Sequence, residues 1–96
     1  MPKAYWIGHV DVKDADTYGQ YAVIATEAIE SHGGVFLARS GRYRQLEGKD
    51  RARNVVAVFP SFEDACACYD SPRYQEAVAF AKLSSTRDLM VVEGVE

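Results

Sequence analysis

Hydrophobic and polar residues alternate over residues 4–12, AYWIGHVDV, with the period of two that a β-strand requires. One of the two alternating sets mixes Tyr5 and Ile7 with the polar residues His9 and Asp11. The other set contains no polar side chain and consists of Ala4, Trp6, Gly8, Val10 and Val12. We therefore predict that the apolar face of this strand meets a layer of helices and that the mixed face points the other way.

Between Asp14 and His32 the period changes to three and four residues, which is typical of an amphipathic helix. Asp14 is the predicted N-cap, and Gly33-Gly34 is the predicted end, because glycine adopts the left-handed conformation that closes helices. A second strand is predicted from Val35 past Gly41 to Leu46, with the glycine at a bulge or bend. Its mixed face is expected to carry Val35, Leu37 and Arg39, and its helix-facing set Phe36, Ala38 and Ser40.

A central strand is predicted at residues 54–59, where the run NVVAVF is almost entirely apolar and Pro60 ends it. Two helix starts follow, a capping box at Ser61 and a second cap at Asp70 or Ser71 with Pro72 in the first helical position. The last strand is predicted at residues 88–94. We assign Leu89, Val91 and Glu93 to its mixed face and Met90 and Val92 to the helix face.

The resulting order, strand, helix, strand, strand, helix, strand, predicts an α+β fold of the ferredoxin-like βαββαβ type. One four-stranded antiparallel sheet would carry both helical regions on one face, and residues 1–96 would form a single domain. The other face would expose Ile7, Leu37, Leu89 and Val91, more apolar surface than a monomer usually exposes. We therefore expect a homodimer with a two-fold axis.

Composition and charge exclude several classes of protein. The chain has no apolar run long enough to span a bilayer and no secretory signal at MPKAYW, so a cytoplasmic protein is expected. Cys66 and Cys68 point about 200° apart on the predicted helix, which indicates reduced structural thiols. His9 and His32 do not complete a metal site with them, and no cofactor motif is present.

Six of the eleven basic residues fall between Arg39 and Arg53, although the net charge of the chain is −3. A solvated hairpin explains this cluster, and nucleic-acid binding is the alternative because RNA-recognition domains share this strand order. The run NVVAVF lacks the aromatic RNA-binding motif of such domains. No nucleic-acid partner is therefore expected.

Four segments together resemble a known family: AYWIGHVDV, GGVFLARSGRYRQLEG, VFPSFEDACACYDSPRYQEA and DLMVVEG. They are similar to the family called domain of unknown function 1330, within the dimeric α+β barrel superfamily. The resemblance covers nearly the whole chain and implies a ferredoxin-like subunit that pairs through its bare sheet face, with a cavity against each sheet. It implies no activity. The wider superfamily includes cofactor-independent monooxygenases, small isomerases and haem enzymes, but this sequence carries no motif specific to any of them.

The candidate site lies on the mixed face, where alternation gathers Tyr5, His9, Asp11, Arg39 and Glu93. The principal hypothesis is a pocket between the sheet and the dimer partner that binds a small organic acid, with Tyr5 beside it and Arg39 as the anion anchor. A purely structural dimer, in which Arg39 and Glu93 form an ion pair, is one alternative.

An enzyme is the other alternative, and the sequence leaves open whether there is any activity. His9 would act as general acid or base, Glu93 would orient it, and Arg39 would hold a substrate oxygen. Tyr69 and Tyr74 would close the entrance, unless they only pack in the core. Without a cofactor, the reaction would use bound substrate alone, as a monooxygenase or isomerase does. We expect His9, Arg39 and Glu93 to converge on one cavity, with Arg39 reaching across about 10 Å, or two strand spacings.

Overall fold

The computed structural model describes residues 2–96, which form four strands and three helices. Strands β1 and β4 at the two ends of the sequence are the longest, with nine residues each. In chain order the elements are β1 (Ala4–Val12), α1 (Ala15–Ser31), β2 (Val35–Arg39), β3 (Arg53–Phe59), α2 (Phe62–Asp70), α3 (Pro72–Ser84) and β4 (Ser85–Glu93).

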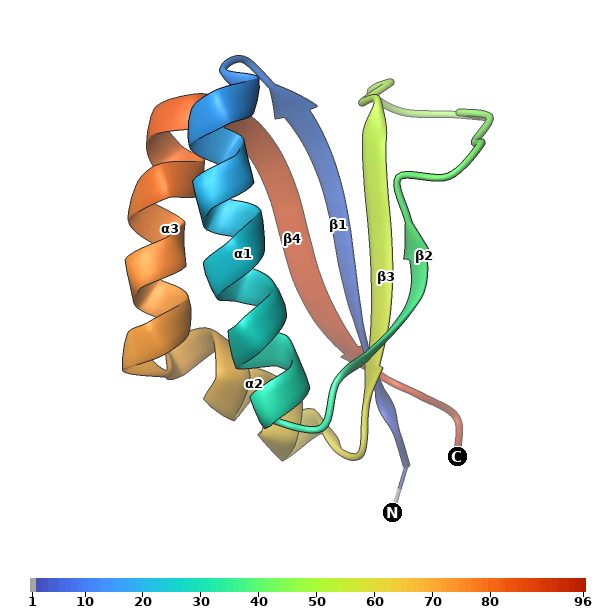
Figure 1. Cartoon of the computed structure of the whole chain (residues 1–96). Helices are drawn as coiled ribbons and strands as arrows, with labels where there is room; N and C mark the ends of the chain where they lie inside the picture. Colours follow the sequence, from blue (N-terminus) through green and yellow to red (C-terminus); the bar gives the residue numbers. More distant parts are fainter. Residues whose placement is uncertain (1) are drawn as a thin grey trace.

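The strands form one antiparallel sheet in the order β2-β3-β1-β4, and all three helices cover the same face (Figure 1). This is the predicted α+β, ferredoxin-like arrangement, with the predicted second helical region divided into α2 and α3. We call the covered side the helix face and the other side the open face. No helix within residues 2–96 has the length and apolar character needed to cross a membrane.

Local sequence signals set the helix ends as predicted. The Asp14 carboxylate caps α1 by accepting from the Thr17 amide, and the Ser61 hydroxyl caps α2 in the same way. Ser71 caps α3, with Pro72 in its first turn. After α1 the chain turns at Gly33, whose φ of 82° lies in the left-handed region that glycine adopts without strain.

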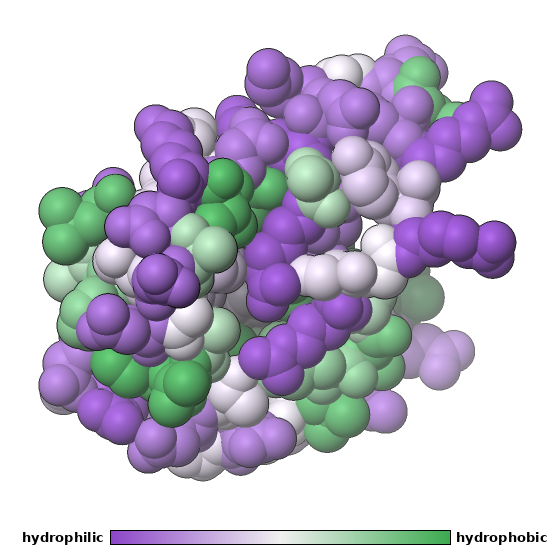
Figure 2. All heavy atoms as spheres, turned by 45° about the horizontal axis from the view of Figure 1, so that its top comes forward, coloured by the Kyte–Doolittle hydropathy of each residue, from purple (hydrophilic) through white to green (hydrophobic). Residues whose placement is uncertain are grey.

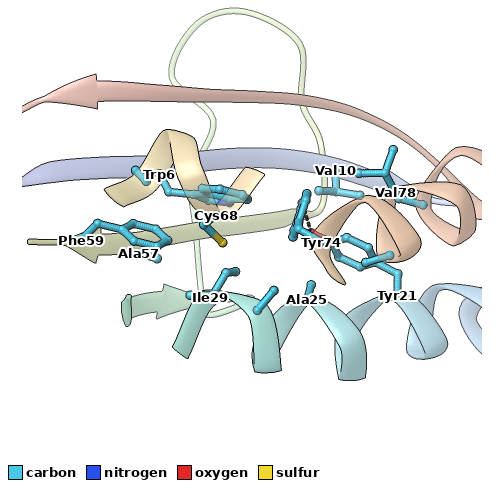
Figure 3. Close-up of a cluster of buried hydrophobic side chains, with 14 of the residues drawn as sticks. Trp6, Val10, Tyr21, Ala25, Ile29, Ala57, Phe59, Cys68, Tyr74 and Val78 are labelled. Carbon is cyan, nitrogen blue, oxygen red and sulfur yellow. Dashed lines mark hydrogen bonds between the residues drawn. The ribbon is translucent and has the colours of Figure 1, made fainter. Parts of the chain in front are cut away.

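Aromatic side chains fill the core between the helices and the sheet (Figure 3). The Trp6 indole is 2% exposed and packs edge-on against the Tyr74 ring, with 5.0 Å between the ring centroids. It also lies 5.6 Å from the ring centroid of Phe59. Burying each such side chain stabilises the fold by about 1.5–3 kcal/mol. The predicted helix face of β1 is therefore confirmed.

The predicted faces of β4 are wrong. Pairing with β1 places Val91 beside Trp6 and Leu89 beside Gly8, so both face the helices, while Met90 and Val92 are exposed on the open face. A Cβ atom at Gly8 would lie only 3.3 Å from Leu89 Cδ1, which shows how the glycine accommodates this leucine. Both alternating sets of β4 are apolar, so alternation alone did not distinguish them.

Strand β2 is shorter than predicted, and its bulge lies elsewhere. The strand ends at Arg39, and the register shifts between Phe36 and Ala38 rather than at Gly41. The extra residue turns Arg39 to the helix face and Ala38 to the open face, the reverse of the prediction. Residues 40–52 form an irregular exposed loop, over which hydrophilic side chains gather (Figure 2).

Candidate functional site

A cavity with a volume of about 620 Å³ lies between β4 and the helices α2 and α3. Apolar side chains supply much of the cavity wall, among them Trp6, Val78, Ala81, Leu89 and Val91. Polar groups at the wall are Tyr69, Asp70, Lys82, Thr86 and Arg87, with the thiol of Cys66 beside them.

Arg87 is the polar residue most firmly held in this wall. It pairs with Val10 in the sheet and therefore projects to the helix face. Its Nη1 donates to the hydroxyls of Tyr21, at 2.7 Å, and Tyr74, at 3.1 Å. The guanidinium lies 4.6 Å from the centroid of the Tyr21 ring, which adds a cation–π contact. Two tyrosines thus hold Arg87 in place, and no carboxylate within residues 2–96 forms an ion pair with it.

The two tyrosine hydroxyls lie 2.7 Å apart and form a buried hydrogen bond (Figure 3). Burial raises the pKa of Tyr74 far above its usual value, so its hydroxyl stays protonated. Burial opposes the charge on Arg87, but the oxygens of Tyr21 and Tyr74 outweigh this effect and raise the pKa of Arg87. Only one of the two hydroxyl protons can occupy the bond between the tyrosines, so the other remains available as a donor.

The two cysteines differ in their surroundings. Cys68 is buried in the core, and burial raises the pKa of its thiol to about 11. It therefore stays a neutral thiol at neutral pH, as a structural role requires. Cys66 is half-buried and lines the cavity. Both are free thiols.

The structure places the two predicted entrance tyrosines differently. Tyr69 lines the cavity and is partly exposed, with its ring 6.1 Å from Trp6 between centroids. Tyr74 is fully buried behind Arg87 and packs in the core, which was the alternative for it. Tyr69 is thus positioned at the cavity, whereas Tyr74 supports the cavity wall from within.

The predicted convergence of His9, Arg39 and Glu93 is wrong. Arg39 turns to the helix face, where its Nη2 donates to Thr26 Oγ1 at 2.6 Å. Glu93 lies on β4, the strand at the opposite edge of the sheet from the strand of Arg39, and pairs with Ala4 of β1. His9 lies on the open face, so the sheet separates it from both. The three residues fail to converge because the bulge in β2 turns Arg39 to the helix face and the register of β4 does the same to Glu93.

On the open face, His9 joins a polar row at one end of the sheet. Its Nδ1 lies 2.6 Å from Asn54 Oδ1. Nearby, Arg51 forms ion pairs with Asp11, at 2.6 Å, and with Asp88, at 3.1 Å. Tyr5 lies toward the other end of β1, half-buried, with its ring against Gly94. These predicted residues share a face but do not line the cavity.

Sequence reasoning missed Arg87 and the tyrosine that holds it from α1. The predicted last strand began at Asp88, one residue too late to include Arg87. Arg87, Leu89 and Val91 belong to one alternating set, and the structure turns that set toward the helices. An earlier strand start combined with the correct face would have found this arginine.

Comparison with solved structures supports the fold. A protein of unknown function from Rhodopseudomonas palustris matches with a TM-score of 0.81 and 16% identity, over 99% of this chain and 84% of that one. SnoaB, a cofactor-independent oxygenase from Streptomyces nogalater, matches with a TM-score of 0.71 and 11% identity, over 100% and 96% of the two chains. A dimeric ferredoxin-like protein of unknown function from Thermobifida fusca matches with a TM-score of 0.62 and 16% identity, over 97% and 92%.

These identities are low enough that the likeness concerns the fold alone. Among curated proteins, none matches this sequence significantly. The model of the family described as "Domain of unknown function (DUF1330)" matches residues 3–95, which is almost the full chain. The resemblance inferred from the four sequence segments is therefore confirmed, and the chain belongs to the DUF1330 family.

Proposed function

We propose that this protein binds a small, largely apolar organic molecule in the cavity between β4 and the helices α2 and α3. A ligand oxygen, anionic or phenolic, would accept a hydrogen bond from Arg87. The observation that carries this proposal is a cavity of about 620 Å³ with a fixed guanidinium in a largely apolar wall. Sites for small molecules are typically 300–1,000 Å³ in volume and combine apolar walls with a few polar groups.

Arg87 is well suited to anchor such a ligand, because its tyrosine partners leave its charge uncompensated. A hydrogen bond to a charged group contributes about 1.5–3 kcal/mol. The hydroxyl pair of Tyr21 and Tyr74 holds the guanidinium in place before the ligand arrives, which reduces the entropy cost of binding. The cavity lies on the helix face, whereas the sequence had suggested a pocket on the open face.

The proposal includes a homodimer formed through the open face. Val35, Leu37, Met90 and Val92 are exposed there, and a similar fold from Thermobifida fusca is described as dimeric. Pairing of two such faces would bury this apolar surface. We expect sedimentation at micromolar concentration to give twice the chain mass. Ile7→Glu should give a folded monomer, and a monomeric wild-type protein would contradict this part of the proposal.

Ligand binding is testable with naphthol as the probe, because Trp6 lines the cavity and is the only tryptophan of the chain. We expect naphthol to shift the indole N–H resonance of Trp6 in proton–nitrogen correlation spectra until the site is saturated. Cys66→Leu extends a larger side chain into the cavity and should weaken binding at least about tenfold, equivalent to about 1.4 kcal/mol.

The matched control is Ala67→Leu, which adds a leucine at the next residue of α2, where the side chain is exposed. Its affinity for naphthol should equal that of the wild-type protein. Equal losses in both variants, or a Trp6 resonance that does not respond, would show that the cavity is not the binding site.

A cofactor-independent oxygenase is the second candidate. The specific observation is the Arg87 guanidinium in the cavity wall, held from behind by the protonated Tyr74 hydroxyl, because a fixed cationic donor is suited to stabilise an oxyanion on a substrate. SnoaB, which has a similar fold, is described as such an enzyme. His9 would not be its base in this cavity, because His9 lies on the other face of the sheet.

In such a reaction an acidic CH₂ group of the substrate would be oxidised to a carbonyl by one O₂, with release of one water. The substrate supplies both electron pairs, so no further reductant is consumed. An oxygen electrode with a phenolic substrate that carries an acidic CH₂ group would measure the rate. We expect Tyr74→Phe to reduce the rate about tenfold, because it removes one of the two hydroxyls that hold the Arg87 guanidinium in place. Oxygen uptake no faster than without protein would exclude this candidate.

A further inference from the structure

Three arginines line a second, narrower pocket between α1 and strands β2 and β3 on the helix face. The pocket has a volume of about 30 Å³. Its polar lining consists of Tyr18, Tyr21, Thr26, Arg39, Arg53 and Arg87. Arg87 also borders the larger cavity, whereas Arg39 and Arg53 belong to this pocket only.

Strand register brings the three guanidiniums together. Arg53 on β3 and Arg87 on β4 both pair with Val10, one on each side of β1. Arg39 on β2 pairs with Val55, two residues from Arg53 along β3. Side chains two residues apart on a strand share a face, so all three arginines project toward the helices. The bulge in β2 is the feature that adds Arg39 to the set.

None of these arginines has a carboxylate partner among residues 2–96. Within this described part of the chain the ion pairs are made by Arg51 and Arg73 instead. Arg39 donates to Thr26 and Arg53 donates to Ser40, both neutral hydroxyls. In addition, Arg53 Nε is buried and has no hydrogen-bond acceptor. Buried donors without an acceptor are rare in folded proteins. The Arg53 Nε–H group is therefore available to donate a hydrogen bond to a ligand.

Aromatic rings support each of the three guanidiniums. Arg39 lies 4.2 Å above the Phe36 ring, Arg53 lies 5.3 Å from the Tyr18 ring, and Arg87 lies against the Tyr21 ring. The Tyr18 and Tyr21 rings are themselves 4.9 Å apart, which links the supports of Arg53 and Arg87. Stacking on a ring leaves the N–H edges of a guanidinium free to bind an anion.

We propose that this pocket binds the carboxylate group of a small organic acid, with Arg53 and Arg39 as its principal ligands. A planar carboxylate matches the fork of guanidinium N–H groups. The pocket is small, with a volume of about 30 Å³, so the planar, three-atom carboxylate group fits it better than a tetrahedral phosphate does. This anion site goes beyond the proposed function, because that function concerns the cavity on the side of α2 and α3.

Acetate is the probe for the test, titrated against chloride at constant ionic strength. We expect the Nε–H resonance of Arg53 to shift until it saturates, because acetate supplies the missing acceptor. Arg39→Gln should weaken acetate binding at least about tenfold, the effect of one lost charged hydrogen bond. Arg42→Gln is the matched control, since it removes the same charge from the exposed loop and should leave the affinity unchanged.

The wild-type titration decides the proposal even where a variant fails to fold. The proposal would be overturned if the Arg53 Nε–H resonance did not shift when acetate is added. It would also be overturned if Arg42→Gln and Arg39→Gln lowered the affinity for acetate equally. Tighter binding of inorganic phosphate than of acetate would overturn the assignment to carboxylates. Cys66→Leu, which blocks the larger cavity, should leave acetate binding intact, so the two sites can fail independently.

Discussion

The two faces of the sheet differ in the groups that surround a buried or half-buried arginine. On the open face, Arg51 is neutralised within the chain by Asp11 and Asp88. On the helix face, Arg87 rests on the hydroxyls of Tyr21 and Tyr74 and keeps its charge. Burying a charge without a counter-ion is unfavourable, so a protein seldom retains one without a function. The contrast indicates that the open face is suited to packing and the helix face to binding.

The largest difference between the faces should appear in stability, and two neighbouring residues of β1 measure it. Trp6 is buried on the helix face, whereas Ile7 is half-buried on the open face. Trp6→Ala should lower the free energy of unfolding by about 3–5 kcal/mol, because it leaves a large cavity in the core. Ile7→Ala should cost less in the isolated subunit. Urea unfolding at several protein concentrations separates this cost from the loss of dimerisation.

A large cost of Ile7→Ala that does not depend on protein concentration would break the comparison. It would mean that the open face contributes to the stability of the single subunit as much as the core does.

The second effect is a dependence of the free energy of unfolding on pH, caused by the buried thiol of Cys68 in the helix layer. Burial raises the pKa of Cys68 from its ordinary value near 9 to about 11, so the folded state holds its proton where the unfolded state loses it. This contribution to stability is fully present below pH 9 and is lost as the pH rises toward 11. We expect a loss on the order of 2 kcal/mol across this interval.

Cys68→Ala should remove this part of the pH dependence, whereas Cys66→Ala, at the half-buried thiol of the same helix, should retain it. Chemical unfolding of each variant between pH 8 and pH 11 is the measurement. An unchanged slope in Cys68→Ala would show that another group causes the decline.

The sequence predicted the helix face better in β1 than in β2 or β4, for reasons visible in particular residues. In β1 the two alternating sets differ sharply, with Trp6 on one side and His9 on the other. In β4 both sets are apolar, and the register with Gly8 decides the faces. In β2 the bulge between Phe36 and Ala38 arises from pairing with β3, which no local pattern encodes.

The candidate site depended on those two strands, and most of its predicted members were therefore not brought together. Arg39 was predicted to anchor an anion beside His9 and Glu93, whereas the structure places it in one pocket with Arg53 and Arg87. A polar residue on an otherwise apolar strand indicates a candidate binding site. Its partners follow only from the register, which involves residues far apart in the sequence.

The smallest effect on stability, and the most direct test of the contrast, comes from removing one cation on each face. Arg51→Met should cost about 1 kcal/mol, because it breaks two partly exposed ion pairs, and should leave naphthol binding unchanged. Arg87→Met should weaken naphthol binding at least about tenfold while the protein stays folded, because methionine fills similar space without a donor. Calorimetric titration of both variants, with unfolding measured in parallel, distinguishes the two roles. If Arg51→Met lost naphthol binding and Arg87→Met kept it, the ligand site would lie on the open face after all.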